Sequence, residues 1–489
     1  MIRRLAVLSF ALLITVHPAS AQKGADLLWQ RWQADAAARG LDLHAESQAA
    51  GADGLDLSGL HLGQSDAGGS IAVRLDHAHL SDDGAGGARL TIPAGQILNL
   101  DLNLDQAEPI SATFRITGDD TSLAAPGPDA PYRLSAPALT LTLQSLSPDI
   151  APAELTATLD VTGLTGMLAG ADAAPDAPVT ADLSASAVSA VIATKNPGDE
   201  HARATSIRQG DVTVSLHHDP GTASDGWTTT LDARSGAGTF SSGPDIPGTG
   251  IVPDLDASQL SGAYLVTLTP TRRETTQHFE GVRYSAALPF SPVNPVTLSA
   301  DSAVFVLSEP GGSASGPQDF AFTADLKGLM PGAEIWNLFD PNGVLKRSPG
   351  ALAADLAGTV MRDGAAPFLA VEPAGEIRHL SLNNLSADLA GVHLDATGQG
   401  DVTPAPDGGG PGDDMAALGI PSGRLDLHVT GFLGLLDTLS NGGSLAPERA
   451  AGLKTLLAVF ARRGEDGSLT SDITLSPEDG LAINGTALR

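Results

Sequence analysis

The sequence contains no cysteine. This absence excludes in one step a disulfide framework, thiol catalysis, iron–sulfur clusters and cysteine-bound zinc. It also excludes the lipid-modified cysteine of a lipoprotein anchor.

Aromatic residues are scarce, with 12 Phe, 4 Trp and 3 Tyr, whereas Gly and Pro number 56 and 33. The cores must therefore consist mainly of Leu, Val, Ile and Ala between frequent turns. Hydrophobic residues make up 42% and charged residues 17% of the chain, which is too apolar for a disordered protein. The shortage of aromatic platforms argues against a sugar-binding enzyme.

Basic residues are also few, because 27 Lys and Arg stand against 57 Asp and Glu, giving a formal net charge of −30. A field of this sign repels nucleic-acid phosphates and anionic headgroups, so no nucleic-acid partner is expected. After the N-terminal region, no segment has 18 uninterrupted apolar residues. We therefore expect no transmembrane segment after signal cleavage.

Residues 1–21 have the three parts of a secretory signal peptide. Arg3 and Arg4 form the charged start, Leu5 to Val16 the apolar run, and small residues precede a cleavage site after Ala21. The apolar run has 12 residues, short of the ~20 that cross a bilayer. The sequence thus predicts a periplasmic protein, with full secretion as the alternative, and no cofactor loaded in the cytoplasm.

Residues 22–40 are predicted to form an amphipathic N-terminal helix. Leu28, Trp32 and Ala36 fall on one helical face, Trp29 lies beside them, and Gly40 marks the stop. An apolar stripe at this spacing is typical of core packing, so we expect this helix to dock on a sheet.

From residue 41 onward the hydrophobic period changes to two, which is the signature of half-buried strands. Polar residues alternate with the apolar ones, as antiparallel sheets with one solvated face require. The clearest alternations are Leu55, Leu57; Ile71, Val73, Leu75; Leu98, Leu100, Leu102, Leu104; Leu139, Leu141, Leu143; Leu155, Ala157, Leu159, Val161; Val212, Val214, Leu216; Tyr264, Val266, Leu268; and Phe320, Phe322, Ala324, Leu326. The predicted fold class is mainly β (β-rich α+β), with long twisted antiparallel sheets, an N-terminal docking helix and a C-terminal helical pair.

Turn-rich segments suggest the domain organisation. Residues 309–318, EPGGSASGPQ, have the composition of a linker. They are predicted to separate an antiparallel β domain, residues 41–308, from a C-terminal α+β domain, residues 319–489. A flexible insertion is expected within the latter, near residues 403–421.

The C-terminal domain is predicted to contain two helices. Pro447 opens the second helix, with an apolar face that includes Leu453 and Phe460, Arg462 and Arg463 at its negative end and a stop at Gly464. A shorter helix is expected over residues 431–440. A hairpin over residues 468–488, turning at residues 477–480, completes the chain.

An Asp-x-x-Gly pattern recurs along the chain at irregular spacing. It ends at Gly59, Gly163, Gly328, Gly358 and Gly391. Irregular spacing is not typical of a solenoid repeat. We interpret these positions as strands that end at a glycine turn.

Several segments resemble the bacterial family called domain of unknown function 2125. They are the helix with Trp29 and Trp32 closing at Gly40, the strand-turn of residues 75–86 followed by residues 90–93, the stretch of residues 338–341 with residues 346–349 and 355–358, and the ending Ala482 to Gly485 with Leu488. Lys346 and Ser348 stand where a proline and an acid are expected for this family. The resemblance implies an exported protein of this architecture and no particular activity.

Two histidine pairs and one glycine-rich loop are candidate metal sites. His77 and His79 fall on one strand face, but no third ligand is identifiable, so they are interpreted as solvated. His217 and His218 point to opposite faces. Gly409, Gly410, Gly412 and Asp414 match a single copy of a calcium-binding repeat, interrupted by Pro411. A single copy favours a flexible acidic loop.

No local motif for nucleophilic catalysis, HExxH metal binding or phosphate cradling is present. We therefore predict no catalytic, cofactor-binding or metal-binding residue, and no enzyme. Two functions remain open. The first is a periplasmic module that binds or transfers an apolar, lipid-like ligand in an apolar trough. The second is a structural or interaction protein of the envelope that contacts a partner through sheet edges or loops and takes no small-molecule ligand.

Overall fold

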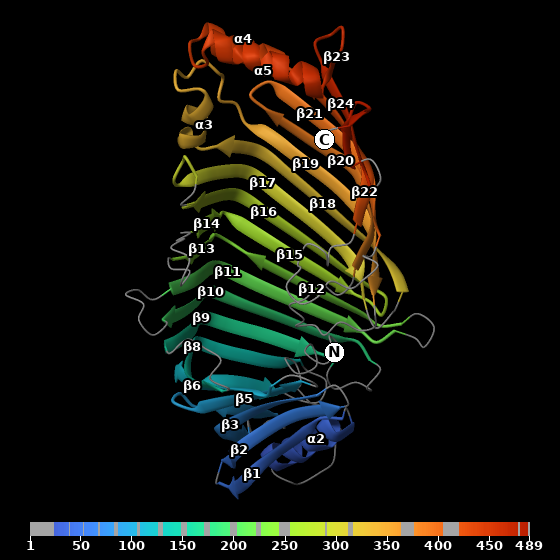
Figure 1. Cartoon of the computed structure of the whole chain (residues 1–489). Helices are drawn as coiled ribbons and strands as arrows, with labels where there is room; N and C mark the ends of the chain where they lie inside the picture. The colour runs from blue at the N-terminus through green and yellow to red at the C-terminus, as the bar shows by residue number, and fades with distance from the viewer. Residues whose placement is uncertain are drawn as a thin grey trace. The chain divides into compact units, whose positions relative to one another are not determined.

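The computed structural model of the chain is mainly β, with strands β1 to β26 and helices α2 to α5 (Figure 1). Each strand pairing for which the register is defined is antiparallel, which confirms the predicted fold class. The structure describes residues 24–38, 40–51, 53–66, 69–82, 87–104, 108–125, 131–147, 154–170, 177–195, 203–221, 226–243, 255–288, 291–311, 316–362, 376–403, 420–477 and 480–487. The predicted signal peptide and the loop from Gly409 to Asp414 lie outside these residues. Among the described helices, none is long and apolar enough to cross a membrane.

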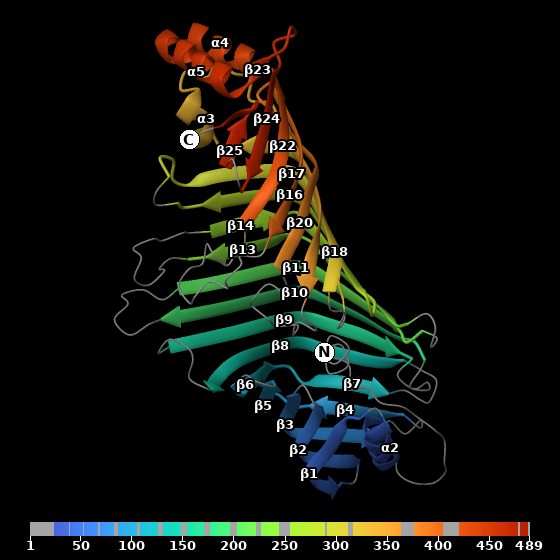
Figure 2. The same ribbon diagram turned by 45° about the vertical axis from the view of Figure 1, so that its right-hand side comes forward.

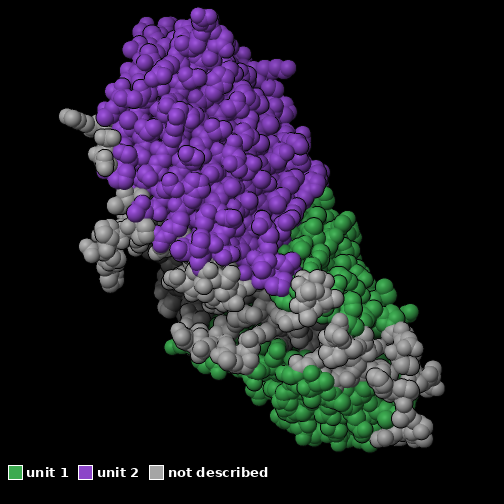
Figure 3. Space-filling view, turned by 90° about the vertical axis from the view of Figure 1, so that its right-hand side faces the viewer, with its two compact units in different colours: residues 1–256, 261–267 green, residues 257–260, 268–489 purple. Residues whose placement is uncertain are grey.

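The chain divides into two compact units (Figure 3). Unit 1 comprises residues 1–256 and 261–267, and unit 2 comprises residues 257–260 and 268–489. The sequence predicts an interdomain linker over residues 309–318; residues 309–310 are the end of β17 (Val296–Pro310) and residues 316–318 the start of β18 (Gly316–Pro331), and these two strands pair with each other. The division into units falls near two short strands, β14 (Leu255–Gln259) and β15 (Ser261–Leu268).

Unit 1 begins with helix α2 and continues as an antiparallel meander. Its elements are α2 (Gly24–Ala38), β1 (Asp42–Ala50), β2 (Gly54–Asp66), β3 (Gly69–Asp82), β4 (Ala88–Ile92), β5 (Ile97–Leu104), β6 (Ile110–Gly118), β7 (Thr121–Ala125), β8 (Tyr132–Ser147), β9 (Glu154–Ala169), β10 (Val179–Lys195), β11 (Arg203–Asp219), β12 (Thr228–Ser235) and β13 (Gly238–Ser242). Strand β3 pairs with both β4 and β5, β8 with both β6 and β7, and β11 with both β12 and β13. Among the described residues, the meander is therefore interrupted at three breaks, β4 to β5, β6 to β7 and β12 to β13.

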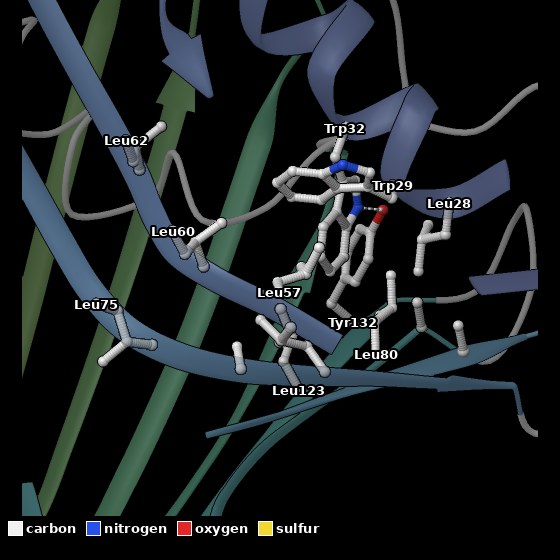
Figure 4. Packing of buried hydrophobic residues seen from close by; sticks show 14 of the residues in the cluster. Leu28, Trp29, Trp32, Leu57, Leu60, Leu62, Leu75, Leu80, Leu123 and Tyr132 are labelled. Carbon is white, nitrogen blue, oxygen red and sulfur yellow. Dashed lines mark hydrogen bonds between the residues drawn. The ribbon is translucent and has the colours of Figure 1, made fainter. Parts of the chain in front are cut away.

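Helix α2 closes the core of unit 1, as the sequence predicts. It contacts β1 to β4, and the side chains of Trp29 and Trp32 point into the cluster that contains Leu57 and Leu80 (Figure 4). The Nε1 atom of Trp32 donates a hydrogen bond to the hydroxyl of Tyr132 at 3.4 Å. Removing both indoles from water is the dominant stabilising contribution of this helix, since large aromatic side chains bury the most apolar area.

Unit 2 is a second meander with three helices. Its remaining elements are β16 (Arg272–Ala286), β17 (Val296–Pro310), β18 (Gly316–Pro331), α3 (Ala333–Phe339), β19 (Gly350–Arg362), β20 (Glu376–Leu389), β21 (Val392–Thr403), β22 (Ile420–Thr430), α4 (Phe432–Asn441), α5 (Pro447–Phe460), β23 (Arg462–Arg463), β24 (Leu469–Ser476), β25 (Gly480–Ile483) and β26 (Thr486–Ala487). Figure 2 shows α3, α4 and α5 gathered at one end of this unit.

The predicted C-terminal helical pair is confirmed as α4 and α5. One detail of the prediction is wrong, because Arg462 and Arg463 do not belong to the last helical turn. Helix α5 ends at Phe460, and the two arginines form β23, whose backbone pairs with Leu469 and Thr470 of β24. After Phe460 the chain therefore pairs with β24 instead of continuing the helix.

Asp340 holds the turn after α3. Its side chain is fully buried and accepts hydrogen bonds from the backbone N–H groups of Val344 (3.0 Å) and Leu345 (2.8 Å) and from the hydroxyl of Ser444 (2.6 Å). Burial raises the pKa of this carboxyl, but the hydrogen bonds from Ser444, Leu345 and Val344 outweigh it and lower the pKa below its ordinary value. Residues 338–341, one of the segments that resemble the family, thus have a structural role, because Asp340 fixes the turn after α3.

The Asp-x-x-Gly interpretation is wrong for most of its members. Gly59, Gly163 and Gly328 lie inside β2, β9 and β18, with φ of 60°, 63° and 67°. Gly358 also lies inside a strand, and only Gly391 occupies the predicted turn. The cross-strand registers of β2 and β9 continue unbroken past Gly59 and Gly163. At Gly328, in contrast, the register between β18 and β19 shifts by one residue, as in a β-bulge.

Strand β2 changes the phase of its apolar positions at the left-handed Gly59. Leu55 and Leu57 precede Gly59 at odd positions, while Leu60 and Leu62 follow it at even positions, and all four are buried. A Cβ atom on Gly59 would come within 2.6 Å of the Glu46 side chain. Apolar side chains therefore stay on one face of β2, although they occupy odd positions before Gly59 and even positions after it.

Candidate ligand-binding face of unit 2

The apolar side chains of unit 2 form continuous rows across its strands. Following the cross-strand register, four rows run from β17 or β18 to β24 or β25, and we call them together the apolar face. The rows are Leu307, Phe322, Leu356, Leu382, Gly398, Leu425, Ile473, Ile483; Phe305, Ala324, Ala354, Leu385, Ala396, Leu427, Ser471; Ala303, Leu326, Leu352, Ala387, Leu394, Val429, Leu469; and Phe320, Gly358, Leu380, Gly400, Gly423, Leu475, Leu481.

The alternation of each strand produces this face. Residues two apart on one strand share a side of the sheet, and the register places equivalent residues of neighbouring strands opposite one another. Strand β20 keeps the pattern through a bulge, since Leu382 and Leu385 occupy neighbouring rows. The one polar member, Ser471, donates its hydroxyl to the carbonyl of Phe460 at 2.6 Å.

The apolar face remains partly open to solvent. Leu380, Leu475 and Leu481 are 38%, 38% and 39% exposed, and most other large residues of the rows are only half-buried. The buried cluster between helices and strands in this unit contains Trp336, Leu345 and Leu439, none of which belongs to the rows. The helices contact β17, β21 and β23. An apolar surface of this extent is typical of a binding surface.

The opposite face of the same strands is polar and dominated by paired charges. His393 lies 2.9 Å from Asp388 through Nδ1 and 2.8 Å from Asp395 through Nε2. The hydrogen bond to Asp388, with the charge of Asp395, raises the pKa of His393. Charged pairs of this kind are typical of a solvated surface. The polar face therefore differs clearly in composition from the apolar face.

A polar hollow of about 370 Å³ lies where β21, β22 and β24 meet. Arg424 lies 2.8 Å from Asp426 and 2.9 Å from Asp472, and the hydrogen bond to Asp426 raises the pKa of its guanidinium. Asp395, also in the lining, is paired with His393. The hollow is therefore lined by a network of ion pairs. One carboxylate oxygen of Asp472 pairs with Arg424, and the other, Oδ1, is buried without a hydrogen-bond partner in the described structure.

Unit 1 has a smaller, apolar cavity beneath α2. It measures about 60 Å³ and is lined by Trp29, Trp32, Leu43, Leu60, Leu62, Val73, Leu75, Leu90, Ile92 and Leu98. A cavity of about 150 Å³ is needed to hold benzene. This cavity is too small for a lipid chain and reflects imperfect packing around the indoles.

The two histidine pairs of the sequence analysis lie on strands, and a carboxylate lies beside one of these pairs. Asp56 of β2 lies 2.7 Å from His79 and 3.8 Å from His77, so a carboxylate that sequence reasoning did not identify joins this pair. The signal was readable only from strand register, since Asp56 and His79 are cross-strand partners. His217 and His218 are consecutive in β11, and Nδ1 of His218 lies 2.8 Å from the Thr229 hydroxyl.

Unit 2 is thus an antiparallel β-sheet with one apolar and one charged face. Residues 278–487 match the model of a family described as an uncharacterized protein conserved in bacteria, domain of unknown function 2125. This match confirms the predicted family over β17 to β26 and most of β16, which includes the whole apolar face. The resembling segments before residue 278 lie outside it. Neither a curated protein nor a solved structure matched the chain.

Proposed function

We propose that this protein is an exported, non-enzymatic module that binds or transfers an apolar, lipid-like ligand in the cell envelope. The apolar face of unit 2 carries the proposal: its longest row crosses eight strands with aliphatic or aromatic side chains at every position except Gly398. At ~4.8 Å between strands, such a row extends over roughly 34 Å.

The energetics favour an acyl chain as the ligand class. Each methylene group moved from water to an apolar contact contributes about 0.8 kcal/mol. A flat aliphatic surface offers this gain without hydrogen bonds, so it suits a chain with few polar groups. The signal-peptide features of residues 1–21 support a periplasmic location for this binding, where lipids must cross an aqueous space.

Native mass spectrometry of the gently purified mature protein tests the proposal. We expect a fraction of the protein to carry phospholipid or fatty acid, and a fluorescent fatty acid to bind in competition with it. Leu380→Glu and Leu475→Glu place a charge among the rows and are expected to weaken binding at least tenfold. Leu456→Glu is the matched control, because Leu456 is 54% exposed on α5, away from the rows. Absence of bound lipid together with no fatty-acid binding would disprove the proposal.

A second candidate function is the interaction protein without a small-molecule ligand, and helix α5 favours it. Leu453, Leu456 and Val459 are 41%, 54% and 65% exposed at a spacing of three residues. Exposed apolar residues at this spacing are typical of a helix that binds in an apolar groove of a partner protein. A photocrosslinker at residue 456, used in intact cells, should capture one partner protein. Recovery of uncrosslinked protein alone would leave the lipid-binding function as the better account.

A further inference from the structure

The outer side of the β1–β2 hairpin in unit 1 gathers two histidines and one aspartate. His44 and His61 are direct cross-strand partners, and Asp42 shares their face because it precedes His44 by two residues. Their neighbours Leu43 and Leu62 point the other way, into the core. The packing of the core thus fixes which side of the hairpin carries the three polar groups.

The potential ligand atoms are close to one another. Nδ1 of His44 lies 2.9 Å from one carboxylate oxygen of Asp42, and Nε2 of His61 lies 3.7 Å from the other. The two imidazole rings stack with centroids 4.7 Å apart and an interplanar angle of 28°. One ligand atom from each residue lies within 4.8 Å of the other two.

We propose that Asp42, His44 and His61 bind a divalent transition metal ion of the Zn²⁺ class. Two imidazoles and a carboxylate are preferred Zn²⁺ ligands, with metal–ligand distances of about 2.0–2.2 Å. Donor atoms around one such ion lie some 3–4 Å apart, so small side-chain rotations suffice. Three protein ligands leave a fourth position for water or an external ligand. Cu²⁺ should bind more tightly than Zn²⁺, following the general order of affinities.

Two neighbouring features bear on this assignment. Arg74 is the cross-strand partner of His61 and would repel a cation, but its guanidinium is paired with Asp101 at 2.8 Å. His77 and His79 share Asp56 on the adjacent strand. Within the described residues, however, only Asp42, His44 and His61 place three ligand atoms within 4.8 Å of one another. The hairpin is therefore the better site.

Isothermal titration of the untagged mature chain with Zn²⁺ tests the proposal. We expect one site with micromolar affinity. His44→Asn and His61→Asn should each weaken it at least tenfold, while His278→Asn, which removes a carboxylate-paired histidine in unit 2, should not change it. Zn²⁺ should also raise the thermal midpoint of the parent chain and leave that of the two hairpin variants unchanged. Circular dichroism of the metal-free variants checks that they fold.

His79→Asn decides between the two strand clusters. Retained affinity in this variant supports the hairpin site. Loss of affinity in His79→Asn but not in His61→Asn would overturn the proposal in favour of a site formed by His77, His79 and Asp56. Binding only at millimolar Zn²⁺, or equal affinity in all variants, would also overturn it, because an unspecific acidic surface then explains the uptake.

Discussion

The apolar residues near the start of unit 1 are enclosed beneath α2, whereas those of unit 2 lie on a sheet face that stays partly exposed. Leu57, Leu80 and Leu90 are at most 2% exposed, while Leu380 and Leu475 are both 38% exposed. Both regions use the same alternation of leucines. The difference is the covering element, since in unit 1 two indoles from one helix fill the space above the strands.

This comparison explains why alternation alone does not reveal function. A row of leucines is a core where a helix or sheet covers it, and an exposed apolar face where it is not covered. Even within unit 1 the cover is local, because Ile192 and Ile207 of β10 and β11 are 50% and 42% exposed. Substitutions in the helix that covers the unit 1 core should therefore change stability by a different amount from substitutions in unit 2.

The largest effect is expected from removing an indole that covers the unit 1 core. Trp29 is 2% exposed, and Trp29→Ala should destabilise unit 1 by about 3–5 kcal/mol, because it deletes a large buried side chain and leaves a cavity. Hydrogen exchange with mass spectrometry should show faster exchange in β1 to β4. Peptides of β18 to β22 serve as the internal control.

Trp29→Phe sharpens the same test. The Nε1 atom of Trp29 is buried without a hydrogen-bond partner in the described structure. Phenylalanine retains most of the apolar area and removes this unsatisfied donor, so it should cost much less than alanine. Equal destabilisation by both substitutions would show that the shape of the indole, rather than its burial, determines the stability of this core.

The next largest effect should come from Asp340 in unit 2. Asp340→Ala removes the acceptor of three hydrogen bonds and leaves two buried N–H groups and the Ser444 hydroxyl unpaired, which should cost about 2–3 kcal/mol. Because folding lowers the pKa of Asp340, its stabilisation is present above the unfolded pKa of about 3.9 and is lost as the pH falls through the folded-state pKa. The difference in unfolding free energy between the parent chain and Asp340→Ala, measured by urea unfolding, should therefore shrink as the pH falls from 7 to 3. A parallel pH dependence in both would contradict it.

A smaller effect is expected at the left-handed Gly59 of β2. Gly59→Ala forces a Cβ atom into left-handed backbone beside Glu46 and should cost about 1–2 kcal/mol. Gly434→Ala is the matched control in helix α4, where a Cβ meets nothing within 4 Å. It should stabilise by about 0.5–1 kcal/mol. Urea midpoints of the two variants should therefore shift in opposite directions, and a shared direction would refute the role given to Gly59.

The phase change at Gly59 also shows how much of the fold could be predicted from the sequence. Fold class, helix α2 and the C-terminal helical pair follow from local periodicity and turn chemistry, so they are predictable. The change of phase from Leu57 to Leu60 is visible in the sequence, but the Asp-x-x-Gly pattern predicts a strand end there, and the strand continues. The apolar face could not be predicted, because it depends on the register among strands as distant in sequence as Leu307 and Ile483 and on what covers them.

The smallest effect concerns the polar face of unit 2. The hydrogen bond to Asp388, with the charge of Asp395, raises the pKa of His393 in the folded state. Its stabilisation is therefore fully present below the unfolded pKa of about 6.5 and is lost as the pH rises through the folded-state pKa. Because the side chain is 37% exposed, solvent screening limits the effect to less than about 1 kcal/mol. An NMR titration of the His393 ring proton should give a lower pKa in Asp388→Asn and an unchanged one in Asp401→Asn, whose carboxylate pairs with His379 instead. If both substitutions lower the pKa of His393 equally, the shift arises from the overall acidic charge and not from the local pair.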